Sequence, residues 1–375
     1  MDSPYISQVI VHDCYAIKEL EGLNIPKEPL KEFKHIILTG KNGSGKTTIL
    51  NRINLILDQR VKLGAMANRL SNGIEIKFSN STHDKDFKDL CIFSFFRAHR
   101  RANVEDVTTV TTDELFLQKL NQSDTGSFAQ LLKQYLVNKK IYEALDYTNG
   151  KEDKVHQNRV FFNNLEKTFQ SIFEDKELKL EFIQESFEFY ITHSDKRKVT
   201  FNNLSDGFSA FLNIVMDLLI RTDLIRKQKK DFDYQPHGIV LIDEPEIHLH
   251  LSMQYNILPL ISRLFPKIQF VVATHSPAII SSLENSIVFD LTSKSEVSDW
   301  VLGSSFSELM VRHFGLENEY SPIADKILEE VNIAAKKKDV KELKSILDKN
   351  EKFLTPVLQL EIESLLITIK NSSND

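Results

Sequence analysis

A glycine-rich segment near the start of the sequence holds the residues with the clearest chemical potential. It reads Gly-Lys-Asn-Gly-Ser-Gly-Lys-Thr over 40–47 and fits the pattern G-x-x-x-x-G-K-[ST]. In that pattern backbone N–H groups surround phosphates, the lysine reaches the β- and γ-phosphates, and the last hydroxyl binds Mg²⁺. The segment therefore predicts a nucleoside triphosphate site with Mg²⁺. Its expected contacts are Gly40, Asn42, Gly43, Ser44, Gly45, Lys46, Thr47 and Thr48, with Lys46 also acting in catalysis and Thr47 also a metal ligand.

The residues on either side supply the elements that such a loop requires. Ahead of it, 36–38 is a short apolar run of the kind found in buried parallel strands. Behind it, apolar residues recur at helical spacing over 48–57. A strand, a glycine loop and a helix N-terminus together favour anion binding, because the helix end adds positive potential.

A second chemical group follows a fully apolar run at 238–242, where the chain continues with Asp243 and Glu244. Four hydrophobic residues followed by Asp-Glu are the pattern of a Walker B strand. At the carboxyl edge of the sheet, Asp243 would hold Mg²⁺ beside the phosphate loop. Glu244 would orient or deprotonate the attacking water, so it is the predicted general base.

His275 is the third predicted participant. A helix is expected over 251–264 and another buried strand over 269–274, which ends just before this histidine. Because a strand–helix–strand unit crosses over to a parallel neighbour, His275 should lie beside Asp243 at the same sheet edge. From there it could hydrogen-bond the γ-phosphate or the attacking water.

Together with Leu204-Ser205-Asp206-Gly207, which opens an apolar helix, these motifs resemble the ABC-type ATPases. The resemblance implies an α/β fold: a P-loop NTPase head with a mixed sheet and flanking helices, carrying a helical insertion and a helical C-terminal tail. It also implies that the nucleotide is ATP and that two heads form a homodimer, which could belong to a higher assembly. In such a dimer Ser205 and Gly207 would contact the γ-phosphate held by the other head.

The stretch Asp-Glu-Pro-Glu-Ile-His-Leu-His at 243–250 looks like that of OLD-like and SMC/RecF-like bacterial ATPases. His248 and His250 could form a metal-binding pair, but the resemblance favours a dimer-contacting loop without metal. The helical tail is similar to that of the stand-alone ATPases in Septu-type and retron-associated anti-phage systems, which work with a separate HNH nuclease. OLD nucleases resemble this chain but carry a Toprim domain after the ATPase, in which an Asp-x-Asp pair binds metal. Residues 276–375 hold no Asp-x-Asp pair, so no intrinsic nuclease is expected.

Hydrophobic periodicity suggests how the rest of the chain is organised. An ATPase domain is expected over 1–300, interrupted by a mostly helical insertion at about 105–177, and a helical region over 301–375. Everything after His275 is expected to be helical, and the basic run 226–230 to be a loop. Further strands are expected at 5–11, 73–78, 90–96, 178–182 and 187–191, and tail helices at 306–314, 323–335, 340–347 and 353–369.

Composition restricts the class of protein. Of 375 residues 41% are hydrophobic and 27% charged, the net charge is −6, and Cys14 and Cys91 are the only cysteines. These values exclude a disulfide framework and a Cys-based zinc site. The first residues lack the features of a signal peptide, and the longest apolar stretch, 211–220, is broken by Asp217. A cytoplasmic protein without a membrane segment is expected.

Two functions of different class remain open. In the first, an ATP-driven switch controls an associated effector, such as a nuclease, in anti-phage defence. In the second, the chain is a RecF-like DNA-binding ATPase of repair or recombination, with Arg97, Arg100, Arg101 and the run Lys227–Lys230 facing DNA phosphates. The family's Q-loop glutamine has no clear counterpart, and Tyr15 is the sole candidate for stacking on the base.

Overall fold

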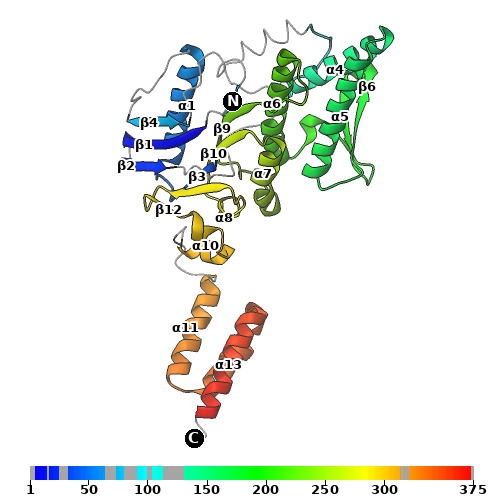
Figure 1. The fold of residues 1–375 in the computed structure, drawn as a ribbon. Coiled ribbons are helices and arrows are strands. Elements are labelled where there is room, and N and C mark those ends of the chain that lie inside the picture. Colours follow the sequence, from blue (N-terminus) through cyan, green and yellow to red (C-terminus); the bar gives the residue numbers. More distant parts are fainter. Residues whose placement is uncertain are drawn as a thin grey trace. The chain divides into compact units, whose positions relative to one another are not determined.

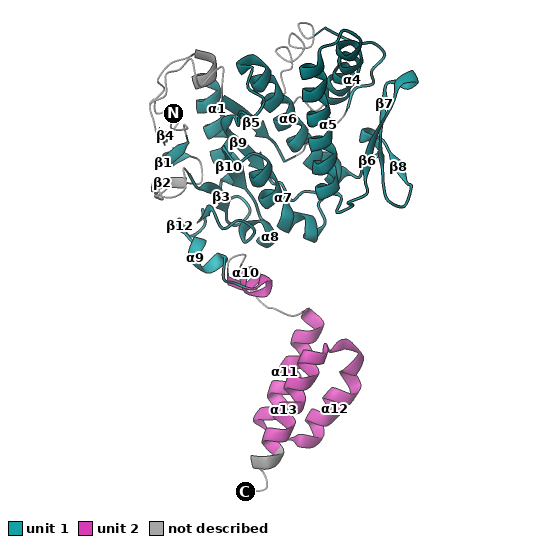
Figure 2. Cartoon of the chain, turned by 45° about the vertical axis from the view of Figure 1, so that its right-hand side comes forward, with its two compact units in different colours: residues 1–304 teal, residues 305–375 magenta. Residues whose placement is uncertain are grey.

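The computed structural model describes residues 5–14, 17–24, 33–63, 73–79, 91–98, 104–112, 131–312, 315 and 321–372. The chain divides into two compact units, residues 1–304 and residues 305–375 (Figure 2). Each unit has its own hydrophobic core. The functional residues predicted from the sequence all belong to the first unit.

A six-stranded sheet with the order β12-β11-β3-β10-β9-β5 forms the centre of the first unit. Five of these strands run parallel, and β12 is antiparallel to β11. The strands β3, β10 and β11 are buried along their whole length, which the apolar sequences of β3 and β10 predict. The bounds are β3 His35–Thr39, β5 Cys91–Phe96, β9 His237–Asp243, β10 Ile268–Ala273, β11 Ser286–Asp290 and β12 Ser295–Glu296.

A smaller antiparallel sheet, β2-β1-β4, shares a core with helix α1 (Lys46–Leu63) and one face of the central sheet (Figure 1). Its strands are β1 Ile6–Cys14, β2 Ile17–Asn24 and β4 Ile74–Phe78. Gln269 of β10 is fully buried and pairs with the backbone of Ile6 through both its amide oxygen and its amide nitrogen. This pairing fixes β1 against the central sheet.

The segment predicted as a helical insertion holds α4 (Leu132–Thr148) and α5 (Glu152–Ile172), followed by a three-stranded sheet of β6 (Lys179–Ile183), β7 (Glu188–Thr192) and β8 (Lys198–Val199). Buried charge pairs attach α4 to its surroundings. Lys133 binds Glu188 of β7, and Lys139 lies 3.0 Å from Asp223 of the long helix α6 (Asp206–Lys229). The hydroxyl of Tyr135 donates to the same Asp223.

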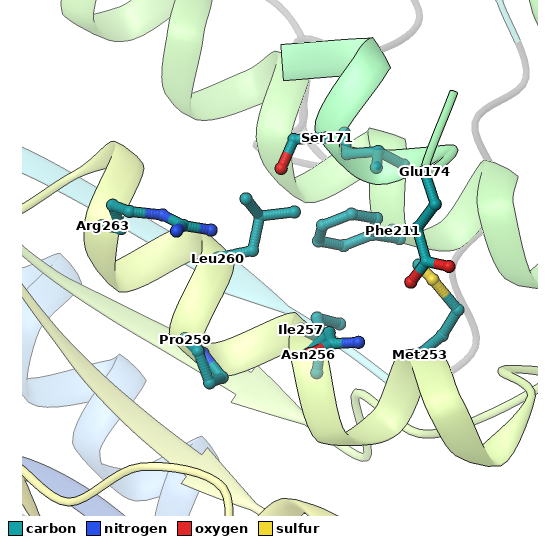
Figure 3. Close-up of a pocket in the computed structure, with 10 residues that line it drawn as sticks. Ser171, Glu174, Phe211, Met253, Asn256, Ile257, Pro259, Leu260 and Arg263 are labelled. Atoms are coloured by element: carbon teal, nitrogen blue, oxygen red, sulfur yellow. The ribbon is translucent and has the colours of Figure 1, made fainter. Parts of the chain in front are cut away.

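Helix α7 (Leu251–Leu264) connects β9 to β10 and leaves a cavity of about 180 Å³ against α5 and α6 (Figure 3). Apolar side chains such as Phe211, Ile257 and Leu260 line its interior, while Glu174 and Arg263 lie at opposite ends. Atoms that line a gap lose contacts on one side. The side chains of α7 that face this cavity therefore lack packing partners on that side.

Short helices complete the first unit: η2 Gln184–Ser186, η3 Phe201–Asn203, α8 Pro277–Ile280 and α9 Ser298–Val301. The second unit contains α10 Phe306–Arg312, α11 Pro322–Lys336, α12 Val340–Asn350, η4 Glu351–Phe353 and α13 Pro356–Ser372. Ser321 caps α11 and Asp339 caps α12 through side-chain oxygens that accept backbone N–H groups. Among the described residues, no helix combines the length and apolar composition needed to cross a bilayer.

The predicted α/β class is confirmed, as a P-loop NTPase fold with a mixed sheet, flanking helices and a helical C-terminal region. The predicted strands and helices are confirmed with shifts of a few residues at their ends, except that Phe314 of the expected 306–314 helix lies outside the described residues.

Two expectations are wrong. The chain after His275 is not wholly helical, because 286–290 forms β11, which pairs in parallel with β3. The basic run at 226–230 is not a loop, because α6 continues to Lys229 and cations are favoured in the last turn of a helix.

Candidate active site

The phosphate loop joins β3 to α1, as predicted. Gly40, Gly43 and Gly45 have φ angles of +133°, +80° and +96°, a region that side-chain-bearing residues rarely adopt. A Cβ atom on Gly40 would lie 2.9 Å from side-chain oxygens of Ser44, Asp290 and Thr292. Glycine at position 40 is therefore required both by the backbone conformation and by the close approach of β11.

Lys46 is the first residue of α1, is 5% exposed, and directs its side chain back into this loop. Its ammonium donates to the carbonyl oxygens of Gly40 (2.8 Å) and Lys41 (3.1 Å) and to the hydroxyl of Ser44 (3.4 Å). Burial lowers the pKa of Lys46 to about 8, and the nearby carboxylates of Glu244 and Asp243 oppose that shift. The three donors of the ammonium are thus directed at loop oxygens, in the position where the loop would surround a phosphate.

Thr47 and Asp243 come together although 196 positions separate them in the sequence. The Thr47 hydroxyl lies 3.1 Å from Asp243 Oδ1, and Asp243 is 4% exposed at the carboxyl end of β9. A hydroxyl and a carboxylate are hard oxygen ligands of the kind Mg²⁺ prefers, so Thr47 and Asp243 could hold this ion. The donor set fits Mg²⁺, and in the described part of the chain no three His, Cys, Asp or Glu side chains gather around a common metal position.

Glu244 follows directly and has an unusual backbone. Its φ is +46°, and its N–H donates to the carbonyl of Ala273 at 2.8 Å. Left-handed conformations of non-glycine residues concentrate at functional sites because the surrounding structure must hold them there. The charge of Glu244 acts on both Lys46 and His275, where it opposes the lowering of the pKa that burial causes in each.

His275 follows β10, and strand register places it at the same sheet edge as Asp243, as predicted. Ala273 pairs with Asp243 across the parallel strands, so both chains leave the sheet at the same edge. Burial, followed by the charge of Lys46, lowers the pKa of His275 below its ordinary value. A neutral imidazole at neutral pH carries one donor and one acceptor nitrogen, which suits contact with a phosphate or a water molecule.

The predicted signature residues lie at the start of α6. Ser205 is exposed at the N-cap position, and its side chain caps no N–H of its own helix. Gly207 is buried, and a Cβ atom there would lie 2.2 Å from the carbonyl oxygen of His248. The signature turn therefore rests against the stretch that follows Asp243 and Glu244.

The other predicted positions are placed as follows. Asn42 is exposed in the loop, Thr48 lies in the first turn of α1, and Ser44 accepts from Lys46. His248 is exposed with φ +62°, and His250 is exposed with Nδ1 3.3 Å from the Ser252 hydroxyl. Tyr15, Arg100 and Arg101 lie outside the described residues.

One residue of this site escaped the sequence analysis. Glu246 directs Oε1 at the backbone N–H of His275 (2.7 Å) and at the hydroxyl of Thr274 (2.8 Å). Burial raises its pKa, although these hydrogen bonds oppose the shift. Its place two residues after Glu244 was visible in the sequence, but its contact with a residue 29 positions later was not.

Known proteins resemble this chain in the region that carries these motifs. A family model described as "AAA domain, putative AbiEii toxin, Type IV TA system" matches residues 125–281, which include the signature, Asp243, Glu244 and His275. A Septu protein PtuA of Bacillus mycoides (strain KBAB4) is 25% identical over 292 residues, covering 74% of this chain and 39% of that protein. A Retron Ec83 probable ATPase of Escherichia coli is 32% identical over 124 residues, covering 30% of this chain and 23% of that protein.

Among solved structures, an Smc head bound to the C-terminal winged-helix domain of ScpA overlaps 76% of this chain and 93% of its own, with 14% identity and a TM-score of 0.40. The chain spans less than two fifths of the Septu protein and less than one quarter of the retron protein. The resemblance to Septu and retron ATPases that the motifs predicted is confirmed by these sequence matches.

Proposed function

We propose that this chain binds ATP with Mg²⁺, hydrolyses it, and uses the cycle to switch a pair of heads between closed and open states. The observation that carries the proposal is the contact between Thr47 and Asp243, which joins the phosphate loop to the end of β9. The charge of Glu244 acts on the pKa of Lys46, and the charges of Lys46 and Glu244 both act on the pKa of His275. A metal-assisted phosphoryl transfer requires this combination of groups.

Each residue has a defined part in the proposed reaction. Lys46 would leave its loop carbonyls to bind the β- and γ-phosphates. Thr47 and Asp243 would hold Mg²⁺, which would supply positive charge beside the phosphate oxygens. Glu244 accepts a proton from the attacking water. Neutral His275 hydrogen-bonds the γ-phosphate or that water.

The low pKa of Lys46 makes nucleotide affinity depend on pH. Phosphate charges favour the ammonium form, while the free protein loses this proton above about pH 8. ATP affinity is therefore expected to be constant up to about pH 8 and then to fall by up to about tenfold per pH unit, with uptake of a proton on binding. Calorimetric titrations in two buffers of different ionisation enthalpy measure both quantities.

The control is Lys46→Arg, whose guanidinium stays charged across this range. The ATP affinity of this variant, whatever its absolute value, should be the same at about pH 8 and at about pH 9.5. A wild-type affinity that stays level over the same interval would contradict the role given to the Lys46 ammonium.

The proposed switch also requires two heads. Ser205 supports this, because it is exposed at the start of a 24-residue helix and its hydroxyl caps none of that helix's N–H groups. A serine hydroxyl and free helix N–H groups can bind an anion. In the proposed dimer, Ser205 and Gly207 of one head contact the γ-phosphate bound by Lys46 of the other.

Mixing two inactive variants tests this arrangement. Lys46→Ala removes the phosphate contact, and Ser205→Arg blocks the signature, so each homodimer should be inactive. A mixed dimer contains one site with an intact Lys46 and an intact Ser205. Hydrolysis is therefore expected to return to as much as about one quarter of the wild-type rate at equal mixing, since half of the random dimers hold one intact site of two.

A mixture that stays inactive although mixed dimers form with ATP would contradict action across the dimer. Activity in either variant alone would contradict the role of the substituted residue. Absence of hydrolysis by the wild-type chain under all conditions would remove the ATPase proposal itself.

The similarity to Septu and retron ATPases leads us to propose a separate effector, such as an HNH nuclease, acting in anti-phage defence in the cytoplasm. A tagged Glu244→Gln copy, expressed with its neighbouring genes and purified with ATP and Mg²⁺, should retain such a partner in fixed ratio. The mass of the eluted complex and the identity of its proteins show whether a partner is bound. A homodimer that elutes alone would contradict the effector proposal.

The described residues give little support to the DNA-binding alternative. Three cations of the basic run act within the chain: Arg226 donates to Tyr234, Lys227 lies 4.0 Å from Asp223, and Lys229 stands over the Tyr234 ring. Arg97 stands over the ring of Phe95. We therefore favour the switch over a RecF-like role. Salt-dependent DNA binding by the wild-type chain that is lost in Arg97→Ala would reverse this preference.

A further inference from the structure

We propose that Glu246 is a positioning residue for ATP hydrolysis, which fixes the main chain of His275 through a closed circuit of hydrogen bonds. The inference rests on the proposed function, because it assigns His275 a part in hydrolysis. Glu246 itself would touch neither the nucleotide nor the attacking water.

A single carboxylate oxygen makes the decisive contacts. Glu246 Oε1 accepts the backbone N–H of His275 at 2.7 Å and the hydroxyl of Thr274 at 2.8 Å. These two residues are the first after β10, where the chain leaves the sheet. An oxygen that accepts both hydrogen bonds restrains the backbone from which the His275 side chain projects.

The restraint continues around a ring of residues. Thr274 Oγ1 accepts the backbone N–H of Ser276 at 2.9 Å, and the Ser276 hydroxyl donates to Gln254 Oε1 at 2.6 Å. Gln254 Nε2 donates to the carbonyl of Leu249 at 2.9 Å. The N–H of Leu249 then donates to the carbonyl of Glu246 at 2.9 Å, which closes the ring.

Three parts of the chain meet in this ring: the turn after β9, the helix α7 and the loop after β10. The turn is held in an unusual form, with positive φ at Glu244 (+46°) and at His248 (+62°), on either side of Glu246. A network that joins three segments restrains each more firmly than one isolated hydrogen bond would. The position of His275 is thereby linked to the turn that carries Asp243 and Glu244.

Stability alone does not account for a carboxylate here. Glu246 Oε2 is shielded from solvent and has no hydrogen-bond partner within the described residues. Burying a carboxylate with one unmet oxygen is unfavourable, and this is why its pKa is raised. Replacement by alanine removes two hydrogen bonds but also this desolvation penalty, so we expect a small effect on stability and a large effect on hydrolysis.

The test is a double-mutant cycle on ATP hydrolysis by the full chain. Glu246→Ala and His275→Ala should each lower kcat by a similar factor, about 10- to 100-fold, with the ATP KM and the Tm little changed. The double variant should be no slower than His275→Ala, because Glu246 acts through His275. Glu246→Gln keeps an acceptor at Oε1 and should retain kcat within about threefold.

The matched control is Glu284→Ala, an exposed acid in the same unit, which should behave as wild type. Amide hydrogen exchange of a peptide covering 274–276, measured without nucleotide, provides a second readout. It should be faster by about tenfold or more in Glu246→Ala and unchanged in Glu246→Gln and Glu284→Ala.

Three outcomes would overturn the inference while leaving the proposed function intact: Glu246→Ala with wild-type kcat, multiplicative losses in the double variant, or unchanged exchange over 274–276. A low kcat in Glu246→Ala together with a wild-type kcat in His275→Ala would also overturn it, since Glu246 would then act on hydrolysis through a group other than His275. A wild-type chain that hydrolyses no ATP would overturn the proposed function and this inference together, which distinguishes the two failures.

Discussion

Glu244→Gln is expected to lower kcat for ATP hydrolysis by about 10²-fold or more while ATP binding persists. The amide cannot accept a proton from water, yet it has nearly the shape of the carboxylate. Lys46, Thr47 and Asp243, which would hold the nucleotide and Mg²⁺, lie in the phosphate loop and at the end of β9 and remain unchanged. Steady-state phosphate release measures kcat, and fluorescent-nucleotide titration measures binding.

Because hydrolysis would open the heads, this variant should also accumulate as a dimer with ATP and Mg²⁺, visible by light scattering. Glu284→Gln is the matched control, since it makes the same chemical change at an exposed acid in the same unit. That control should hydrolyse ATP at close to the wild-type rate. A Glu244→Gln protein with wild-type kcat would refute the assignment of the general base.

Gly207→Ala is the second change with a large expected effect. The added Cβ would lie 2.2 Å from the carbonyl oxygen of His248 and 2.9 Å from its carbonyl carbon. Both are backbone atoms, so the first turn of α6 or the 243–250 stretch must move. Overpacking of this kind costs about 1–3 kcal/mol of folding stability. Since Ser205 lies on the same turn, hydrolysis should fall about 10²-fold, whereas ATP binding to the separate phosphate loop should persist.

Gly303→Ala is the control for this substitution, because its nearest atom would be the Trp300 carbonyl oxygen at an ordinary 3.9 Å. It should leave both the Tm and kcat at wild-type values. Wild-type hydrolysis by Gly207→Ala would show that the signature turn does not need its contact with His248. Loss of ATP binding in Gly207→Ala would show instead that the substitution disturbs the phosphate loop.

Local sequence was sufficient for most of the proposed catalytic site. The phosphate loop depends on glycines at positions where φ is positive, and that requirement is visible in the sequence itself. Asp243 and His275 could be brought together in advance because each follows a buried strand, and the carboxyl ends of parallel strands share one edge. Both predictions follow from short-range rules of backbone geometry.

Other features could not be obtained from local pattern. The segment 286–290 is five residues long with apolar residues only at 287–289, and periodicity does not separate so short a run from a buried helix. Its pairing with β3 decides that it is a strand. That pairing also brings Asp290 and Thr292 against Gly40, where the Thr292 hydroxyl accepts the N–H of Lys41 at 2.8 Å.

The basic run at 226–230 is a second segment whose local sequence predicted the wrong structure. Its charge density favours a loop, but α6 continues to Lys229, where cations face the carbonyl end of the helix and Arg226 donates to the backbone of Tyr234. A contact with a later segment outweighed the local composition.

By itself, then, the sequence determined the phosphate loop, the acidic pair after β9 and the histidine after β10, because these depend on residue type and strand order. Only the tertiary structure decided that Glu246 holds His275, that Gly207 rests on His248 and that β11 supports Gly40. Each of these contacts joins segments between 29 and 250 positions apart, by side-chain or backbone approach that no pattern of neighbouring residues encodes.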